Sequence, residues 1–498
     1  MIRPLTQNQR ALSLVVSTVG ATTEISAAEM EKIGITGVSS SSNNVEAGDL
    51  FCAFAGANVH GATFAKDAIK SGAVAILTDA EGAKLIKGLP VLVVANPRKS
   101  AAVLSSWFYG EPMRDLFSIG ITGTNGKTTV STLCHQILQN AGQESGLIGT
   151  VETRIGNEVL SSVRTTPEAA ELQSLVATMR ERHCRNLVME VSSHAIALER
   201  VRAGYFAAVG FTNLSQDHLD FHGSMEDYFA VKSKLFTYEY ADQAFINIDD
   251  SYGQTLAASI DLPVQTISRF NESATWHYTR IEEGVQYSDI SIRGTGGILI
   301  DSRTSLRGGF NFDNLLMAVA ICTESGIDPI DIATLIPNLV GPVGRLEPVH
   351  LGQNFTALVD YAHSPDAVAR VLSATREMTD KKVIGVLGCG GDRDSSKRNL
   401  MGQELSLRSD IAIFTSDNPR SEKPEKILEQ MTSGLRISSP SAIVQDRAEA
   451  IQLAVNLAQP GDVVIVLGKG HERGQEIQGV IHPFDDRLVL AQAIEAKK

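Results

Sequence analysis

Residues 116–129 constrain the fold of this chain more than any other stretch, because an apolar run breaks there into a glycine-flanked turn. Phe117, Ile119 and Ile121 before the turn are compatible with a β-strand. Beyond the turn, apolar side chains recur at helical spacing until Gly142 offers a stop. A buried strand that leads directly into a helix start presents free backbone N–H groups and a helix dipole, which attract phosphate. The stretch therefore predicts a nucleotide phosphate loop inside an α/β domain.

The side chains of this loop fit that prediction. Lys127 can reach the terminal phosphates of a nucleotide, and the Thr128 hydroxyl can bind Mg²⁺. The common spacing G-x-x-x-x-G-K-[ST] would require glycine where Ile121 stands, so the loop is a shorter variant. The alternative is an ordinary strand-to-helix turn with an incidental lysine. The residues expected at the nucleotide are Gly123, Thr124, Asn125, Gly126, Lys127, Thr128 and Thr129.

The chain of 498 residues is too long for one hydrophobic core, which stops growing at about 250–300 residues. Apolar runs alternate with helical patterns throughout, which is typical of mostly parallel sheets covered by helices. We expect an α/β protein of three domains: a smaller N-terminal domain (1–112), a central P-loop ATPase-like domain (113–343) and a Rossmann-like C-terminal domain (344–498). The first boundary follows Pro112, which precedes the phosphate-loop strand.

Charge and cysteine content exclude several classes of protein. A net charge of −13 disfavours nonspecific binding to nucleic acids or anionic membranes, because the overall field repels polyanions. Five scattered cysteines without a C-x-x-C pair indicate neither a disulfide framework nor a zinc site. No secretion-signal pattern and no apolar run of about 18 residues occurs, so a cytoplasmic protein that is not inserted in a membrane is expected.

Two polar residues stand out at the ends of central strands, where ligands of parallel sheets gather. Glu190 lies inside the apolar run 187–191, where a carboxylate is costly unless it is paired or bound to metal. His218 follows the run 209–214. The alternatives are a buried ion pair for Glu190 and a plain structural hydrogen bond for His218.

Three loops of the third region also follow apolar runs, at 383–387, 411–415 and 463–467, and carry Arg, Asp, His and Glu. Guanidinium groups bind carboxylates and carboxylates bind ammonium, so the loops together predict a pocket for a zwitterionic ligand. Solvated turn residues are the alternative. The first loop, at Gly388, lacks the G-x-G-x-x-G spacing of a dinucleotide site.

Six motifs in this order resemble the Mur ligases of peptidoglycan synthesis, over nearly the whole chain. They lie at 123–129, 190–194, 213–218, 344–347, 360–365 and 417–420. Within the family, the chain is most similar to the ligases that extend UDP-N-acetylmuramoyl-L-alanyl-D-glutamate (UDP-MurNAc-L-Ala-D-Glu). The resemblance implies an N-terminal domain for the UDP end of that substrate, a central ATPase domain, and a C-terminal domain that binds an amino acid and closes over ATP.

The implied reaction is ATP-driven amide formation through an acyl phosphate, which demands positioning and charge neutralisation more than a nucleophilic side chain. By resemblance, Lys127 contacts the β- and γ-phosphates, Thr128 and Glu190 hold one Mg²⁺, and His218 with Glu190 helps to hold a second. Lys232 matches a lysine that is carbamylated in the family and bridges toward Mg²⁺, although a solvated lysine is the simpler interpretation of the bare sequence.

Further contacts follow from the same resemblance. Asn314, Arg345 and Asp360 match nucleotide contacts. Ser42, Thr165, Thr166, Ser192 and Arg200 match contacts to the UDP-substrate. In place of the Asp-Ser-Arg usual at the uridine end, the chain has Ser41-Ser42-Asn43.

The motif at 417–420 resembles that of ligases that add meso-diaminopimelate. This amino acid carries a second carboxylate that Arg420 could bind and that L-lysine lacks. The residues expected in its pocket are Arg393, Asp417, Asn418, Arg420, Gly468 and Glu472. The expected ligands are therefore ATP, Mg²⁺, UDP-MurNAc-L-Ala-D-Glu and meso-diaminopimelate, and a monomer is expected.

Three other functions remain open at this point. The same ligase could add L-lysine or another diamino acid, and a folylpolyglutamate synthase-like ligase also carries a short phosphate loop. A P-loop regulatory NTPase is the third, although no Asn-Lys-x-Asp guanine signature occurs. Neither of the last two explains the three polar loops of the C-terminal region together with a UDP-type N-terminal domain.

Overall fold

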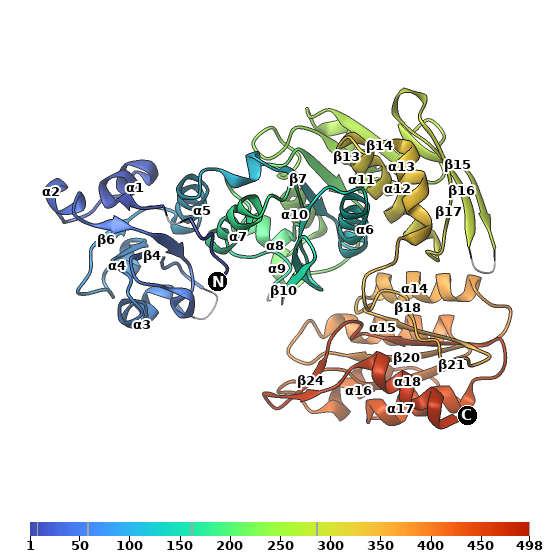
Figure 1. The fold of residues 1–498 in the computed structure, drawn as a ribbon. Coiled ribbons are helices and arrows are strands. Elements are labelled where there is room, and N and C mark those ends of the chain that lie inside the picture. Colours follow the sequence, from blue (N-terminus) through green and yellow to red (C-terminus); the bar gives the residue numbers. More distant parts are fainter. Residues whose placement is uncertain (7, 57–58, 161, 163, 285–286, 498) are drawn as a thin grey trace.

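The structure is a computed structural model that describes residues 1–6, 8–56, 59–160, 162, 164–284 and 287–497. Three sheet-containing lobes follow one another along the chain, from the blue N-terminal lobe through the green and yellow centre to the orange and red C-terminal lobe (Figure 1). Each lobe combines strands with covering helices, which confirms the predicted α/β class. No described helix has both the length and the apolar character needed to cross a membrane.

The N-terminal lobe is built on a parallel sheet of four strands in the order β3-β4-β5-β6. The strands are β3 (Gly37–Ser39), β4 (Asp49–Cys52), β5 (Ala75–Thr78) and β6 (Val91–Val93), with a small antiparallel pair of β1 (Arg10–Ala11) and β2 (Gly34–Ile35). The helices are α1 (Leu12–Val19), α2 (Ala27–Met30), α3 (Ala65–Lys70), α4 (Ala80–Ala83) and α5 (Pro97–Phe108). The polar stretch 39–44 begins at the last residue of β3 and ends in a 3-10 turn, η1 (Ser42–Asn44).

The central lobe holds an eleven-stranded sheet in the order β10-β9-β8-β11-β7-β12-β13-β14-β15-β16-β17. Its strands are β7 (Phe117–Thr122), β8 (Ser145–Ile148), β9 (Thr153–Ile155), β10 (Glu158–Leu160), β11 (Asn186–Glu190), β12 (Ala208–Phe211), β13 (Ala244–Asn247), β14 (Val264–Ser268), β15 (Trp276–Glu283), β16 (Ser288–Arg293) and β17 (Leu299–Thr304). The middle of the sheet, from β8 to β15, is parallel, and both margins are antiparallel.

Helices cover both faces of this sheet. They are α6 (Lys127–Asn140), α7 (Ala169–Glu181), α8 (Ser193–Ala197), α9 (Leu219–His222), α10 (Met225–Ser233), α11 (Ser251–Ser259), α12 (Gly309–Glu324) and α13 (Pro329–Leu335). Val188 of β11 lies in the apolar core beneath α6 and α12, whereas its neighbours Leu187 and Met189 lie in the core beneath α7. Because both faces are buried, the parallel strands are continuous apolar runs, which is how the sequence revealed them.

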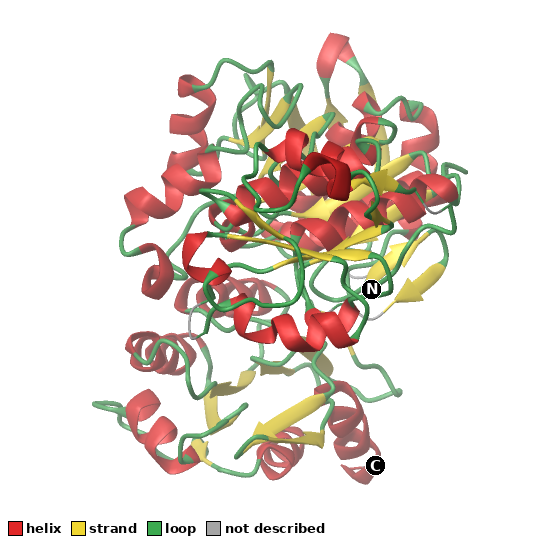
Figure 2. Ribbon diagram, turned by 90° about the vertical axis from the view of Figure 1, so that its left-hand side faces the viewer, coloured by secondary structure: helices red, strands yellow, loops and turns green. Residues whose placement is uncertain are grey.

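The C-terminal lobe has a six-stranded sheet in the order β18-β19-β23-β20-β21-β22. Its strands are β18 (Glu347–Pro348), β19 (Thr356–Asp360), β20 (Val383–Cys389), β21 (Ile411–Ser416), β22 (Ala442–Ile443) and β23 (Val463–Leu467), and a separate hairpin pairs β24 (Gly474–Ile477) with β25 (Val480–Pro483). The helices are α14 (Pro365–Glu377), α15 (Ser396–Arg408), α16 (Pro424–Thr432), α17 (Arg447–Leu457) and α18 (Asp486–Lys497). Figure 2 shows the yellow strands lying between layers of red helices.

The start of α14 has a clear local cause. Ser364 caps the helix by accepting a hydrogen bond from Ala367 N, and Pro365 occupies the first helical position. Gly388 and Cys389 were expected in a loop, but β20 continues through them because both pair with β21. The polar loop therefore begins two residues later than predicted.

Candidate active site

The phosphate loop joins β7 to α6, and its two glycines are required by close packing. Gly123 and Gly126 have φ values of +142° and +88°, in the region that favours glycine. A Cβ atom on Gly126 would lie 2.4 Å from Oδ1 of Asn314, and one on Gly123 would lie 1.9 Å from Oγ1 of Thr212. The loop is thus pressed against α12 and against the end of β12.

The residues that follow β12 fix the loop backbone. Thr124 N donates to the carbonyl of Asn213 at 2.9 Å, and Asn125 N donates to Asn213 Oδ1 at 3.0 Å. The Thr212 hydroxyl and the Asn213 amide both donate to the carbonyl of Asn125, at 2.6 and 3.1 Å. Asn213 was part of a predicted motif without a role, and the structure gives it one: it shapes the phosphate loop.

Lys127 lies over the loop that precedes it. Its Nζ donates to the carbonyls of Gly123 and Thr124, each at 2.9 Å. Burial lowers the pKa of Lys127, and the negative charges of Glu190 and Asp217 oppose this effect. The ammonium group is therefore held at the mouth of the loop, where a terminal phosphate would displace its carbonyl contacts.

Glu190 is fully buried at the end of β11, and it accepts hydrogen bonds only from uncharged donors in the described part of the chain. Thr128 Oγ1 donates to Glu190 Oε2 at 3.0 Å, and Thr150 donates to the carboxylate through its backbone N at 2.7 Å and its hydroxyl at 3.1 Å. The alternative of a buried ion pair is therefore wrong. A carboxylate beside a threonine hydroxyl is a donor set that fits Mg²⁺.

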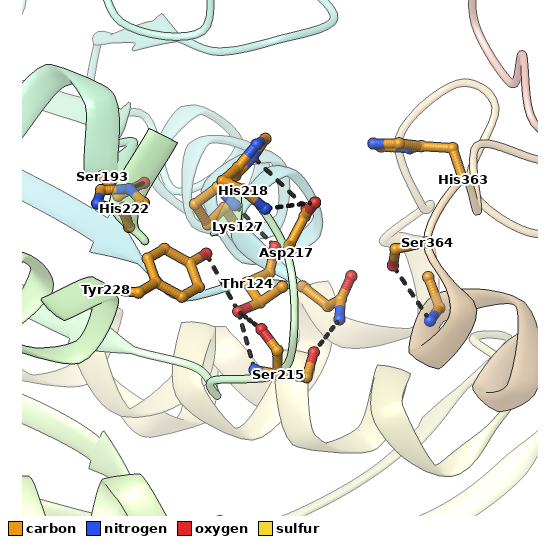
Figure 3. Close-up of polar contacts among 12 residues, drawn as sticks. Thr124, Lys127, Ser193, Ser215, Asp217, His218, His222, Tyr228, His363 and Ser364 are labelled. Atoms are coloured by element: carbon orange, nitrogen blue, oxygen red, sulfur yellow. Dashed lines mark hydrogen bonds and ion pairs between the residues drawn. The ribbon is translucent and has the colours of Figure 1, made fainter. Parts of the chain in front are cut away.

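His218 lies close to the same loop but contacts a different carboxylate. Its Nε2 is 3.5 Å from Asp217 Oδ2, and its ring packs edge-on to His194 with centroids 4.9 Å apart. Figure 3 shows Lys127, Asp217 and His218 together, with His363 of the C-terminal lobe facing them. Among the described residues, no cluster of three His, Cys, Asp or Glu side chains is arranged to hold a metal, so a second Mg²⁺ at His218 stays a prediction.

Lys232 of α10 is buried, with 1% of its surface exposed, so the interpretation as a solvated lysine is wrong. Its Nζ donates to the carbonyl of Gly123 at 2.9 Å and lies 4.8 Å from the centroid of the Tyr228 ring. Burial and the neighbouring Lys127 ammonium lower the pKa of Lys232 well below its usual range. Lysines 127 and 232 thus converge on one carbonyl group.

A cavity runs from the phosphate loop along the carboxyl ends of β12, β13 and β14 and is closed by the C-terminal lobe. Seven of the residues predicted for the nucleotide line it: Asn125, Gly126, Thr128, Thr129, Asn314, Arg345 and Asp360. The prediction missed other lining residues, among them Asp249, Arg269, Phe270, Asp313 and Arg370. Asp249, Arg269 and Phe270 follow the ends of β13 and β14. This position could have identified them from the sequence, because ligands bind at strand ends in such sheets.

Asp360 orders the wall that the C-terminal lobe contributes. Its two carboxylate oxygens accept from Leu346 N and Ala362 N, both at 2.7 Å, and burial raises its pKa. The neighbouring Arg345 guanidinium lies over the Tyr361 ring, 4.6 Å from its centroid. Asp360 therefore holds the backbone that presents Arg345 to the cavity.

The residues predicted for the UDP-substrate largely come together beside Glu190. The Thr166 hydroxyl donates to the carbonyl of Glu190 at 2.8 Å and accepts from Ser192 N at 3.2 Å, and Arg200 donates to the Thr166 carbonyl at 3.3 Å. Thr165 shares a 3.0 Å hydrogen bond with Thr150. Ser42 lies apart, in η1 of the N-terminal lobe.

Sequence reasoning missed Glu168, which gathers three guanidinium groups between the N-terminal and central lobes. Arg98, Arg164 and Arg200 lie 3.3, 2.7 and 2.9 Å from its carboxylate. Three positive charges on one negative charge leave a cationic surplus, which suits an anionic part of a ligand.

Several of the residues predicted for the amino acid lie together where the loops after β21 and β23 meet. Asn418 Nδ2 donates to Glu472 Oε2 at 2.7 Å, and a Cβ atom on Gly468 would lie 2.8 Å from Asp417 Oδ2. Arg420 donates to the Gly391 carbonyl at 2.7 Å and lies 3.3 Å from Glu476. Arg393 is exposed on the first loop, after β20. The sequence did not single out Lys469, which lies among these residues, because nothing local distinguishes it from a solvated lysine.

A glycine-flanked strand-to-helix loop on a parallel sheet, with a second α/β lobe that lines the cavity beside it, is typical of multidomain enzymes that use a nucleoside triphosphate. Three family descriptions match the chain in order: Mur ligase family, catalytic domain (34–104), Mur ligase middle domain (121–322) and Mur ligase, glutamate ligase domain (344–470). The chain therefore belongs to the Mur ligase family and, as a member, is an ATP-dependent ligase.

Individual relatives agree over most of the chain. It is 47% identical over 470 residues to the UDP-N-acetylmuramoyl-L-alanyl-D-glutamate–2,6-diaminopimelate ligase of Streptomyces coelicolor, covering 93% of this chain and 92% of that one. A solved structure of a ligase with the same description has a TM-score of 0.68 at 29% identity and covers 98% of this chain and 99% of its own. The MurF ligase of Thermotoga maritima in complex with ADP shares the fold, with a TM-score of 0.62 at 16% identity, over 93% of this chain and 96% of its own.

Proposed function

We propose that the chain adds meso-diaminopimelate to the D-glutamate γ-carboxylate of UDP-MurNAc-L-Ala-D-Glu, in the synthesis of peptidoglycan precursors. The observation that carries this proposal is the group of side chains on the C-terminal loops, where the Arg420 guanidinium lies 3.3 Å from Glu476, and Asn418 of the same loop donates to the carboxylate of Glu472. The distal end of meso-diaminopimelate carries both an ammonium and a carboxylate group, which match the carboxylates and the guanidinium of these loops. The distal end of L-lysine carries the ammonium group but no carboxylate. The relatives described above, which bear this activity in their names, support the same substrate.

The site favours a reaction in which the substrates supply the attacking groups and the protein supplies charge and position. The γ-carboxylate attacks the γ-phosphate, the bond to ADP breaks, and the resulting acyl phosphate is attacked by the amine of the amino acid, which expels phosphate. Lys127 and the loop amides hold the phosphates. Thr128 and Glu190 would hold Mg²⁺, which would neutralise part of the phosphate charge.

We assign the three predicted domains to the three substrates. Residues 1–112, together with Thr165, Thr166, Ser192 and Arg200, would bind the UDP-substrate, and the three arginines around Glu168 suit its anionic portion. Residues 113–343 would bind ATP, and residues 344–498 would bind the amino acid and close the nucleotide cavity. The monomeric state and the cytoplasmic location stay predictions.

The experiment that tests the proposed activity measures ADP release with UDP-MurNAc-L-Ala-D-Glu across a panel of diamino acids. We expect meso-diaminopimelate to stimulate release far more than L-lysine does. Arg420→Ala should reduce the preference for meso-diaminopimelate over L-lysine by about tenfold or more, because it removes a charge-assisted contact to the second carboxylate. Stimulation by L-lysine alone would contradict the assigned specificity and leave the ligase class intact.

A further inference from the structure

Lys469 lies at the centre of the amino-acid pocket, although neither its sequence context nor the pattern of the motifs indicated it. The side chain is completely buried. Its Nζ donates to Asn418 Oδ1 at 3.0 Å and to Glu472 Oε2 at 2.9 Å, and it lies 3.6 Å from Asp417 Oδ1. One ammonium group thus contacts three side chains that were each predicted to bind the amino acid.

The main chain is shaped to bring Lys469 to this place. Gly468 and Gly470 flank it with φ values of +112° and +54°, a backbone that other residues rarely adopt. A Cβ atom on Gly470 would lie 2.6 Å from the Tyr361 side chain, and one on Gly468 would meet Asp417. Because both neighbours must be glycine for the loop to fit, the position of the Lys469 ammonium is fixed by the fold.

The charges in the pocket explain what this ammonium does. Asp417 and Glu472 bring two negative charges, and Lys469 brings one positive charge to both of them. Arg447, another buried cation of this lobe, donates to both carboxylate oxygens of Asp486 and to the main-chain carbonyls of Ser416 and Leu467, and it acts on Asp417 and Glu472 through space. Asp417 and Glu472 together carry one negative charge more than Lys469 supplies, and the Arg447 guanidinium also acts on both through space, so an ammonium group of a ligand can bind beside two carboxylates that are already partly balanced.

We propose that Lys469 is a positioning residue that holds Asp417, Asn418 and Glu472 in their binding orientation and balances part of the negative charge of the two carboxylates. This inference rests on the proposed function, because it takes the ligand to be an amino acid with a distal ammonium group. Without Lys469, the carboxylates of buried Asp417 and half-buried Glu472 would lose the cation that they share, and one of them would turn away or take up a proton.

The test compares steady-state constants for Lys469→Met with those of Lys497→Met. Lys497 is a matched control, since its ammonium also donates to carbonyls of the same lobe, those of Val455, Asn456 and Ala458, but contacts no pocket residue. We expect Lys469→Met to raise KM for meso-diaminopimelate by about tenfold or more, as expected for lost charge-assisted hydrogen bonds, with KM for ATP and for the UDP-substrate within about twofold. Lys497→Met should leave all three constants unchanged.

Two further variants keep the test decisive if Lys469→Met folds poorly. Lys469→Gln retains a donor without the charge and should give an intermediate KM. The double variant Lys469→Met with Asp417→Asn restores the net charge of the pocket and should recover part of the lost affinity, which a purely structural role would not produce. An unchanged KM for the amino acid in folded Lys469→Met or Lys469→Gln, or an equal rise in KM for ATP, would overturn the inference.

The same measurements separate this inference from the proposed substrate. They are made with whichever diamino acid the unsubstituted enzyme uses best. If that proves to be L-lysine, the proposed specificity fails, and the effect of Lys469→Met on KM for L-lysine still decides the role of Lys469. A rise confined to the amino acid supports the positioning role, and its absence contradicts it.

Discussion

Lys127 and Lys232 donate to the same carbonyl, that of Gly123, each at 2.9 Å. Two ammonium groups this close repel each other, and burial lowers the pKa of both. A neutral amine is the form of lysine that reacts with carbon dioxide. A carbamate at Lys232 would place an anion beside the Lys127 ammonium and replace a repulsion by an attraction.

Replacement of Lys127 tests the phosphate role proposed for this residue. Lys127→Ala should lower kcat by about 100-fold or more, because the charge that develops on the transferred phosphoryl group loses its nearest cation. The free energy of unfolding should change little, since the hydrogen bonds of the ammonium within the described part of the chain go to loop carbonyls. Turnover assays and thermal melting of the same sample check both statements, and full activity would contradict the phosphate role.

The second prediction concerns Lys232. Lys232→Ala should lose most activity, and short-chain carboxylates should restore part of it by supplying the missing anion within the cavity left by the side chain. Lys232→Met, which fills the cavity, serves as the control and should not be rescued. Normal activity of Lys232→Ala without added carboxylate would rule out a functional carbamate.

Among the helices, α14 makes the contact that joins the C-terminal lobe to the phosphate loop. Asn125 Nδ2 donates to Asp366 Oδ2 at 3.2 Å and to Ser215 Oγ at 3.3 Å. Asp366 also pairs with Arg370, one turn later in the helix, at 2.9 Å. Arg370 also lines the cavity beside the phosphate loop. The start of α14 therefore connects the phosphate loop to the part of the C-terminal lobe that lines this cavity.

Asp366→Ala should therefore raise KM for ATP by about fivefold to tenfold, in keeping with the loss of one hydrogen bond to a charged group. Asp366→Asn keeps an oxygen that can accept from Asn125 and should lie closer to the unsubstituted enzyme. Steady-state kinetics with small-angle scattering checks the result. An Asp366→Ala variant with unchanged KM and an unchanged radius of gyration would show that the contact is dispensable for closure.

The start of α15 gives a prediction of pH dependence. The guanidinium of buried Arg398 donates two hydrogen bonds to Glu422, at 2.7 and 2.9 Å, and lowers the pKa of Glu422 from 4.5 to about 2. A carboxylate whose pKa is lower in the folded state than in the unfolded state stabilises the fold at pH values above its unfolded pKa. This contribution of Glu422 is lost as pH falls from 4.5 through about 2. Glu422→Gln should lower Tm at pH 7, and the difference from the unsubstituted protein should shrink toward pH 2. A Tm difference that stays constant over this range would contradict the assignment.

Elements with a local signal were predictable, and contacts between elements were not. The strand, loop and helix around Lys127 and the capped start of α14 follow from residues that are neighbours in the chain. Asp366 and Lys469 each owe their role to a partner from a distant segment, Asn125 and Asn418, so no spacing revealed that role. Glu190 was recognised because a carboxylate in an apolar strand is costly anywhere.

In the whole molecule, the cavity beside the phosphate loop is lined by the central and C-terminal lobes, and the proposed UDP-substrate region adds Arg98 of the N-terminal lobe. The central sheet order places β11 and β12 on either side of β7, so Glu190 and Asn213 meet the phosphate loop although they are far from it in sequence. The sequence suggested the three lobes through length and repeated strand patterns. It could not supply the sheet order or the wall that α14 adds to the nucleotide cavity, because both depend on tertiary packing.

The central claim is that these lobes form one site that couples ATP to amide formation through an acyl phosphate. The most direct test labels the D-glutamate γ-carboxylate of UDP-MurNAc-L-Ala-D-Glu with ¹⁸O and follows the label during turnover with ATP and meso-diaminopimelate. The mechanism predicts that each phosphate released carries one ¹⁸O atom from the carboxylate, in step with amide formation. Phosphate that is released without label, as in simple hydrolysis of ATP by water, would contradict the claim.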